Sequence, residues 1–170
     1  MKSHRPKGIK PKKPGPGQES VWDYPRPPAL EQINEGIRVI WEGHEIVRSH
    51  AAYRVLETSH PPVYYIPPED IDMQYLTAGS GASFCEYKGR AAYYNLKDNR
   101  TGVPNAAWYY PTPSKAFAAI AGYVAFYPSK VDQAWVGDDL VTAQEGDFYG
   151  GWITPKVVGP FKGSAATWGW

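Results

Sequence analysis

The sequence predicts one mainly β domain, built as an antiparallel barrel or as a pair of packed sheets. Its apolar segments are short and rich in Val, Ile, Tyr and Trp, and Gly or Pro bounds most of them, which is typical of strands joined by turns. The chain has 170 residues, of which 42% are hydrophobic and 21% charged, and this balance suits a single domain with a sizeable core. We therefore expect one β domain over residues 18–170, preceded by a tail over residues 1–17.

The segments with the composition of strands follow one another along the whole body. They are residues 37–41, 45–48, 54–57, 63–66, 84–88, 91–96, 106–109, 123–127, 133–136 and 152–154. Gly43-His44 lies between the first two and predicts a hairpin, and Lys88-Gly89-Arg90 predicts another between residues 84–87 and 92–94.

Three segments favour short helices instead. Residues 29–34 follow a Pro pair, and residues 68–76 begin with Pro-Glu-Asp, which suits a first helical turn. Residues 114–121 are rich in Ala, with Ser114 as a candidate N-cap. We expect all three to be minor additions to a sheet.

The tail differs from the rest of the chain in charge. Residues 1–17 hold six Lys or Arg and no acidic residue, whereas the remainder holds 12 basic and 17 acidic residues. A segment of Lys, Pro and Gly has little to bury, so we expect the tail to be disordered or polyproline-like. Basic arms bind nucleic acid or anionic lipid, and short ones also serve as solubilising extensions. The acidic body offers no surface for phosphates, which argues against a nucleic-acid partner.

Signals for a membrane or for secretion are absent from the sequence. No apolar run approaches the roughly 18 residues that span a bilayer, and the N-terminal residues lack the apolar stretch of a signal peptide. The one cysteine, Cys85, cannot form a disulfide within the chain or a Cys-rich zinc cluster. These features favour a cytoplasmic protein without a membrane partner, in which Cys85 is a reduced thiol.

Aromatic residues make up 15% of the chain, and Tyr outnumbers Phe by thirteen to five. Many rings therefore carry a hydroxyl that needs a partner, as at the wall of a cavity or on a recognition surface. The alternative is an aromatic core whose hydroxyls reach solvent at the rim. In Tyr64-Tyr65, Tyr93-Tyr94 and Tyr109-Tyr110, neighbours on a strand point to opposite faces, so one ring of each doublet can line an interior. A barrel lined in this way would hold a small molecule.

Known catalytic and cofactor motifs are missing, so the residues alone do not name a reaction. The sequence has no phosphate-binding loop, no Gly-x-Ser-x-Gly elbow, no His-Glu-x-x-His and no Cys pair. His44, His50 and His60, with Glu45, could hold a metal only if the fold brought distant strands together. We expect neither a cofactor nor a metal.

Two segments carry candidate reactive groups. On a strand, Cys85 and Tyr87 would share one face while Glu86 and Lys88 share the other, so that Lys88 lies away from the thiol. The alternative is a small buried Cys beside a surface ion pair. Glu57 lies in an otherwise apolar segment, where burial would favour its protonated form and make it a general base; the alternative is a charge at a sheet edge.

The chain resembles the family catalogued as domain of unknown function 427, from about Glu19 to Trp170. The blocks that carry the resemblance are residues 19–28, 54–65, 85–89, 105–108, 122–129, 148–154 and 159–163. The resemblance implies a β-tent or tepee-like barrel, present as a single domain or as a tandem pair.

The family is sometimes labelled nucleotidyltransferase, but no catalytic motif comes with that label. Such an enzyme gathers carboxylates around a magnesium ion. The available aspartates lie in turn-like or helix-start contexts and form no pattern: Asp70, Asp72, Asp132, Asp138 and Asp139. Other β-tent proteins bind zinc through paired Cys-x-x-Cys knuckles, whereas this chain has only Cys85.

The first functional hypothesis is a small-molecule-binding β-barrel with an aromatic-lined pocket, and whether it is an enzyme stays open. We expect the pocket to be lined by Tyr64, Tyr93, Trp108, Tyr127 and Trp152, with Arg54, Glu57, Glu86 and Lys88 as polar anchors. If chemistry occurs, Glu57 or Glu86 would be the general acid or base, and Cys85 the nucleophile. The second hypothesis is a non-catalytic interaction module that docks a protein through residues 19–28 and the tail. The third is a nucleotidyltransferase. The sequence leaves open whether the chain forms a homodimer.

Overall fold

Short strands account for most of the regular structure. The computed structural model of the protein describes residues 5–146 and 148–170. One four-stranded antiparallel sheet has the spatial order β10 (Val124–Phe126), β9 (Gly102–Tyr109), β8 (Gly89–Lys97) and β7 (Leu76–Cys85). A second has the order β12 (Asp139–Leu140), β11 (Gln133–Val136), β3 (Ile37–Trp41) and β4 (His44–Ser49). The mainly β class is therefore confirmed.

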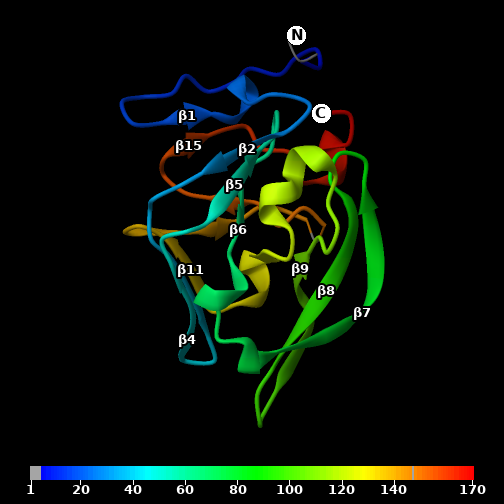
Figure 1. The fold of residues 1–170 in the computed structure, drawn as a ribbon. Helices are drawn as coiled ribbons and strands as arrows, with labels where there is room; N and C mark the ends of the chain where they lie inside the picture. Colours follow the sequence, from blue (N-terminus) through cyan, green and yellow to red (C-terminus); the bar gives the residue numbers. More distant parts are fainter. Residues whose placement is uncertain (1–4, 147) are drawn as a thin grey trace.

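Three smaller sheets complete the arrangement. A three-stranded antiparallel sheet has the order β2 (Ala29–Gln32), β5 (Tyr53–Leu56) and β6 (Val63–Tyr65). The two pairs are β1 (Glu19–Ser20) with β15 (Val157–Val158), which is parallel, and β13 (Thr142–Ala143) with β14 (Trp152–Ile153). The β1–β15 pair lies at the end of the molecule where both termini lie, and β7, β8 and β9 form a long twisted ribbon along one side (Figure 1).

The sheets remain open among the described residues. A bridge between Ile66 and Val124 joins the end of β6 to β10, so that the three-stranded sheet continues into the first four-stranded one. At the far edges, β2 pairs only with β5 and β7 pairs only with β8. The hydrogen bonds therefore leave two free edges, and the closed barrel stays a prediction.

Every helical segment of the described residues is a short 3-10 helix. These are η1 (Val21–Asp23), η2 (Pro68–Asp70), η3 (Met73–Tyr75), η4 (Lys115–Ile120), η5 (Pro128–Lys130) and η6 (Ala165–Thr167). None of the helical segments in the described part has the length and hydrophobicity that crossing a membrane requires.

One predicted helix is wrong and another is divided. Residues 29–32 form β2, because pairing with β5, from Ala29 opposite Leu56 onward, satisfies the backbone at the sheet edge. Residues 68–76 contain η2 and η3, which are separated where the Asp72 N–H donates to the Ile46 carbonyl (2.8 Å). The third prediction corresponds to η4.

The predicted strands all overlap observed ones, with one informative failure. The predicted hairpin forms between β3 and β4, but its turn is Glu42-Gly43 and not Gly43-His44, because His44 pairs with Trp41. Both turn residues have positive φ, as in a two-residue hairpin loop. In the segment predicted as 84–88, however, β7 ends at Cys85, and residues 86–88 form the turn into β8. The chain reverses there because Cys85 pairs with Gly89.

The first four-stranded sheet carries a core cluster on each of its faces, although much of β7 at its edge is exposed. Its inner face joins β3, β4 and β11 in the main core, where Trp41, Phe126 and Trp152 are almost fully buried. The opposite face carries a second cluster of mostly aromatic side chains. Its buried members are Val55, Tyr65, Ala91, Trp108, Tyr110, Phe117, Ile120, Ala125 and Tyr127. This second cluster forms the floor of the candidate site described below.

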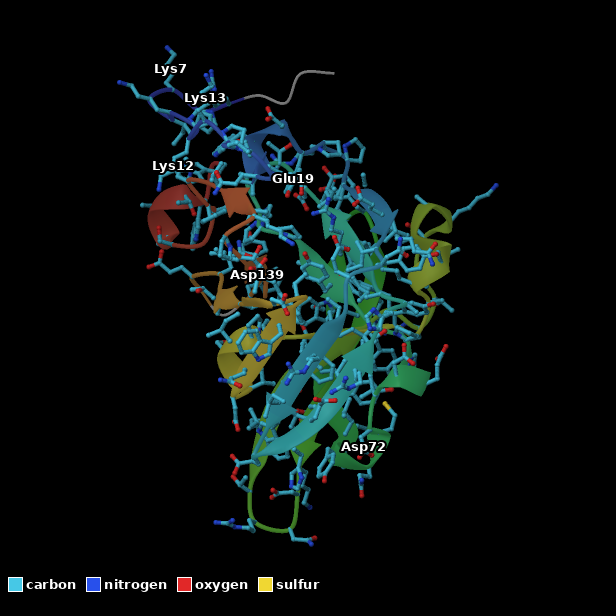
Figure 2. All side chains as sticks on the ribbon, turned by 90° about the vertical axis from the view of Figure 1, so that its left-hand side faces the viewer. Lys7, Lys12, Lys13, Glu19, Asp72 and Asp139 are labelled. Carbon is cyan, nitrogen blue, oxygen red and sulfur yellow. The ribbon has the colours of Figure 1, made fainter. Side chains whose placement is uncertain are left out.

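The described part of the N-terminal segment lies against the body. Ile9 packs against the cluster around Val21 and Trp22, and the Lys12 N–H donates to the Gly159 carbonyl (2.8 Å). Lys7, Lys12 and Lys13 gather at this end of the molecule, beyond Glu19 (Figure 2). Residues 1–4 lie outside the described residues, and the boundary at residue 18 stays a prediction.

Thr58 links the loop after β5 to the segment before β2 by a hydrogen bond, and its replacement by Val is expected to destabilise the fold. Its hydroxyl is buried and donates to the Tyr24 carbonyl at 2.6 Å. Valine has a similar shape but no donor, so that carbonyl loses its partner at a cost of about 1–3 kcal/mol. Urea unfolding would measure the loss, with Thr112→Val at an exposed position as the control, where a change within about 0.5 kcal/mol is expected. Equal stabilities of the two variants would exclude this role.

Candidate functional site

A cavity of about 270 Å³ lies over the second aromatic cluster. Its walls come from β6, the end of β7, β8, β9, and the loops that precede β6 and β14. Seven of the residues proposed from the sequence line it: Glu57, Cys85, Glu86, Lys88, Tyr93, Trp108 and Tyr127. The fold thus brings together residues from segments that are far apart in the chain.

The turn that follows Cys85 changes the predicted arrangement of its charged neighbour. Because residues 86–88 form a turn, the alternation expected of a strand does not apply there. Lys88 folds back, and its Nζ donates to Cys85 Sγ at 3.4 Å. The prediction that Lys88 lies on the opposite face from the thiol is therefore wrong. Glu86 is exposed at the rim of the cavity.

The Lys88 ammonium is buried, with only 8% of the residue exposed. It lies 5.5 Å from the ring centroid of Phe117 and 5.9 Å from that of Tyr110, which gives it cation–π contacts. Among residues 5–146 and 148–170, no carboxylate lies within ion-pair distance of its nitrogen. A buried cation without a carboxylate partner is costly, so this position favours the arrival of an anion.

A line of polar groups crosses the aromatic floor of the cavity. The Trp108 indole N–H donates to the Tyr65 hydroxyl at 3.3 Å. Burial raises the pKa of Tyr65, and burial with the neighbouring Tyr65 hydroxyl and Cys85 sulfur raises the pKa of Tyr110. Both hydroxyls therefore keep their protons at physiological pH.

Glu57 and His60 form the polar wall opposite. Glu57 directly follows β5, and its Oε2 lies 3.4 Å from Arg26 Nη2 and 3.7 Å from His60 Nε2. Burial, reinforced by the positive charges of Lys162, Arg26 and Lys88, lowers the pKa of His60 to about 3. His60 is therefore neutral at physiological pH, and cations dominate the field around it.

Gln144 fixes the orientation of His60 and of the loop beside it. Its Oε1 accepts the Gly151 N–H at 2.9 Å, so its amide nitrogen is the donor that faces Lys162 O (2.6 Å) and His60 Nδ1 (3.4 Å). Nδ1 is then the acceptor, and the network assigns the proton of the neutral ring to Nε2, which faces Glu57. Nothing in the sequence around Gln144 or His60 indicates this contact, which joins residues 84 positions apart.

Three residues proposed as ligand contacts lie outside the cavity. Arg54 pairs with Glu19 (2.8 Å) and Glu31 (2.9 Å). Tyr64 packs on Trp152 in the main core, with ring centroids 5.0 Å apart, and the Trp152 indole N–H donates to the Phe126 carbonyl. These contacts hold strands together and leave the three side chains away from the cavity.

Each tyrosine doublet contributes one ring to the cavity. The rings that line it are Tyr65, Tyr93 and Tyr110, whereas Tyr94 and Tyr109 stack on each other with centroids 4.6 Å apart. The alternation argument therefore describes the doublets correctly, although parity alone did not select Tyr65 over Tyr64. Tyr149 was also not named from the sequence; it packs on His60 with ring centroids 4.7 Å apart.

The residues considered for metal or nucleotide chemistry do not gather. Within the part of the chain that the structure describes, no group of three or more His, Cys, Asp or Glu could hold a metal ion. His44 stacks on Tyr75, and His50 Nδ1 lies 3.2 Å from the Asn34 carbonyl. Asp72 and Asp139 lie in different parts of the molecule (Figure 2). The remaining aspartates of that set are also spread over separate elements: Asp70 in η2, Asp132 before β11 and Asp138 before β12.

Comparison with known proteins gives one family match. The family model described as "Domain of unknown function (DUF427)" matches residues 29–137. This span includes Cys85, Lys88, Glu57 and His60, whereas Gln144 and Tyr149 lie beyond it. No curated protein matches the chain.

Proposed function

Since the chain belongs to the DUF427 family, a family of unknown function, we propose from its own geometry that the cavity binds a small molecule with an apolar or aromatic body and an anionic group. The observation that carries this proposal is the buried Lys88 ammonium, which faces the cavity without a described carboxylate partner. An anionic ligand would supply the missing countercharge.

The walls support an apolar or aromatic body for this ligand. Trp108 and Tyr127 pack with ring centroids 4.6 Å apart, and Tyr65 meets Trp108 edge to face. Such rings bind flat apolar groups through stacking and edge contacts. Cavities for drug-sized ligands have volumes of roughly 300–1,000 Å³, so about 270 Å³ favours a molecule near the size of a single aromatic ring with its substituents.

The electrostatics of the polar wall support the anionic group. The positive charges of Lys162, Arg26 and Lys88 all lower the pKa of His60. Of these three cations, Arg26 forms an ion pair with Glu57 among the described residues. His60 adds no positive charge of its own, because it is neutral at physiological pH. The ligand's anion is therefore expected beside Lys88, and its ring beside Trp108, Tyr93 and Tyr127.

Roles in catalysis follow from position. Cys85 lies inside the cavity next to Lys88, whereas Glu86 is exposed at the rim and Glu57 already faces Arg26 and His60. Of the three residues proposed from the sequence, Cys85 is the one we place beside the ligand's charged group.

Benzoate and benzamide provide a matched test, because they share a ring and differ in charge. Calorimetric titration of the wild type is expected to give tighter binding of benzoate by about 10- to 100-fold, which corresponds to one charge-assisted hydrogen bond. Lys88→Met is expected to abolish this difference. Lys115→Met, at an exposed position of η4, is expected to keep it. Equal affinities of the wild type for both probes, or an unchanged preference in Lys88→Met, would refute an anion site at Lys88.

A further inference from the structure

The single cysteine of the chain lies in the cavity within reach of a ligand. Cys85 is partly exposed and ends β7, where the turn brings the Lys88 ammonium to 3.4 Å from its sulfur. The chain has no other cysteine, so any thiol chemistry of this protein takes place here. Ligand binding alone does not require a thiol at this position.

Two polar groups lie beside the Cys85 sulfur. Lys88 supplies a positive charge, and the Tyr110 hydroxyl lies beside the sulfur as a second donor. No carboxylate of the described residues lies within ion-pair distance of the ammonium, so its N–H donors stay available to the sulfur and to an anionic ligand. A thiolate is the nucleophilic form of cysteine, and a neighbouring lysine is one of the groups known to stabilise it.

The Lys88 ammonium has enough N–H donors to bind the Cys85 sulfur and an anionic ligand at the same time. An ammonium has three N–H donors, and one of them is directed to Cys85. A carboxylate bound by another donor would hold the carbon next to it close to the sulfur. This step rests on the proposed function, because it takes the ligand's anion to lie at Lys88.

We propose that Cys85 is a catalytic nucleophile, which bonds to an electrophilic carbon adjacent to the carboxylate of a small substrate, with Lys88 as the anchor of that carboxylate. A lone pair of the Cys85 sulfur forms the S–C bond while the bond from carbon to the leaving group breaks, and its electron pair departs with the leaving group as an anion. The thiol proton passes to solvent, and no oxidant or reductant is needed. Lys88 then faces the bound carboxylate as its countercharge.

Iodoacetate and iodoacetamide test this proposal, because they carry the same leaving group and differ in the anionic group. Their alkylation rates are measured by intact mass at one pH and one ionic strength, with glutathione as the free-thiol reference. The ratio of the iodoacetate rate to the iodoacetamide rate is expected to be about tenfold higher for the protein than for glutathione. Lys88→Met is expected to lower the ratio to that of glutathione, Lys115→Met to leave it unchanged, and Cys85→Ser to prevent labelling.

The wild-type ratio needs no variant, so the test stands even if Lys88→Met does not fold. A wild-type ratio equal to that of glutathione, or no labelling of the folded protein, would overturn the proposal. Benzoate titration of Cys85→Ser separates the two proposals. If benzoate binds but the ratio is not raised, the pocket exists and the nucleophile is rejected. If benzoate does not bind and the ratio is raised, the cation-directed nucleophile stands and the proposed aromatic ligand is rejected.

Discussion

Acidification below pH 6.5 is expected to destabilise the folded protein through His60 by about 1.4 kcal/mol for each pH unit. Burial and nearby cations lower the pKa of this residue from 6.5 to about 3. Above pH 6.5 the imidazole is neutral in the folded and the unfolded chain, so it adds no pH dependence there. Between pH 6.5 and about 3 the unfolded chain binds a proton that the folded chain does not, so stability falls across this window.

A single variant isolates this contribution. The charged groups near His60 are Lys162, Arg26, Lys88 and Glu57. His60→Gln retains a polar side chain and removes the titration, whereas the carboxylates that do not contact His60 titrate in both proteins and cancel in the comparison. Between pH 6.5 and 4.5 the wild type is expected to lose about 2–3 kcal/mol more than the variant, measured by urea unfolding.

The exposed His50 provides the control for that measurement. His50→Gln makes the same replacement at an exposed ring, and this variant is expected to follow the wild-type curve. If His60→Gln instead followed the wild-type curve, His60 would not be the buried neutral group that the site requires. A protonated His60 would then add its own positive charge to those of Lys162, Arg26 and Lys88 at the cavity.

The sequence predicts strands well where local composition decides them. Residues 37–41 and 133–136 form strands with these bounds, because branched and aromatic residues are bounded there by turn-forming ones. The first half of β7 was not predicted, because Gly79 and Gly81 interrupt the strand-like composition, and the structure has a register irregularity there between Ala78 and Ala82. Residues 29–32 form a strand only because β5 lies beside them, and this is tertiary information.

The candidate site was predictable to the extent that strand alternation applies. Alternation predicts that one ring of each tyrosine doublet faces the cavity without selecting which ring, and it fails after Cys85, where the chain turns and returns Lys88 to the thiol. The environment of His60 could not be predicted, because Gln144 and Lys162 reach it from loops far along the chain. Local patterns therefore suggest which residue types serve the site, and the long-range contacts decide which ones do.

Gly150 holds the loop before β14 against the aromatic wall, and Gly150→Ala is expected to disturb both stability and ligand binding. This residue has a φ of +67°, and an added Cβ would lie 2.6 Å from Trp108 Cη2 and 3.0 Å from Tyr127 Cδ1. Trp108 cannot simply retreat, because it packs on Tyr127 and its indole N–H donates to Tyr65. The variant therefore combines strain of the left-handed backbone, about 1–2 kcal/mol, with overpacking of about 1–3 kcal/mol.

Gly43→Ala separates these two contributions. Gly43 has a φ of +76° but nothing within 4 Å of an added Cβ, so its replacement carries the backbone strain alone. Urea unfolding is expected to show Gly150→Ala as less stable than Gly43→Ala by about 1–3 kcal/mol. Benzoate affinity is expected to fall only in Gly150→Ala, because displacement of Trp108 alters the wall against which the ring of the ligand would bind. Equal stabilities and equal benzoate affinities of the two variants would show that the contact between Gly150 and Trp108 does not shape the cavity.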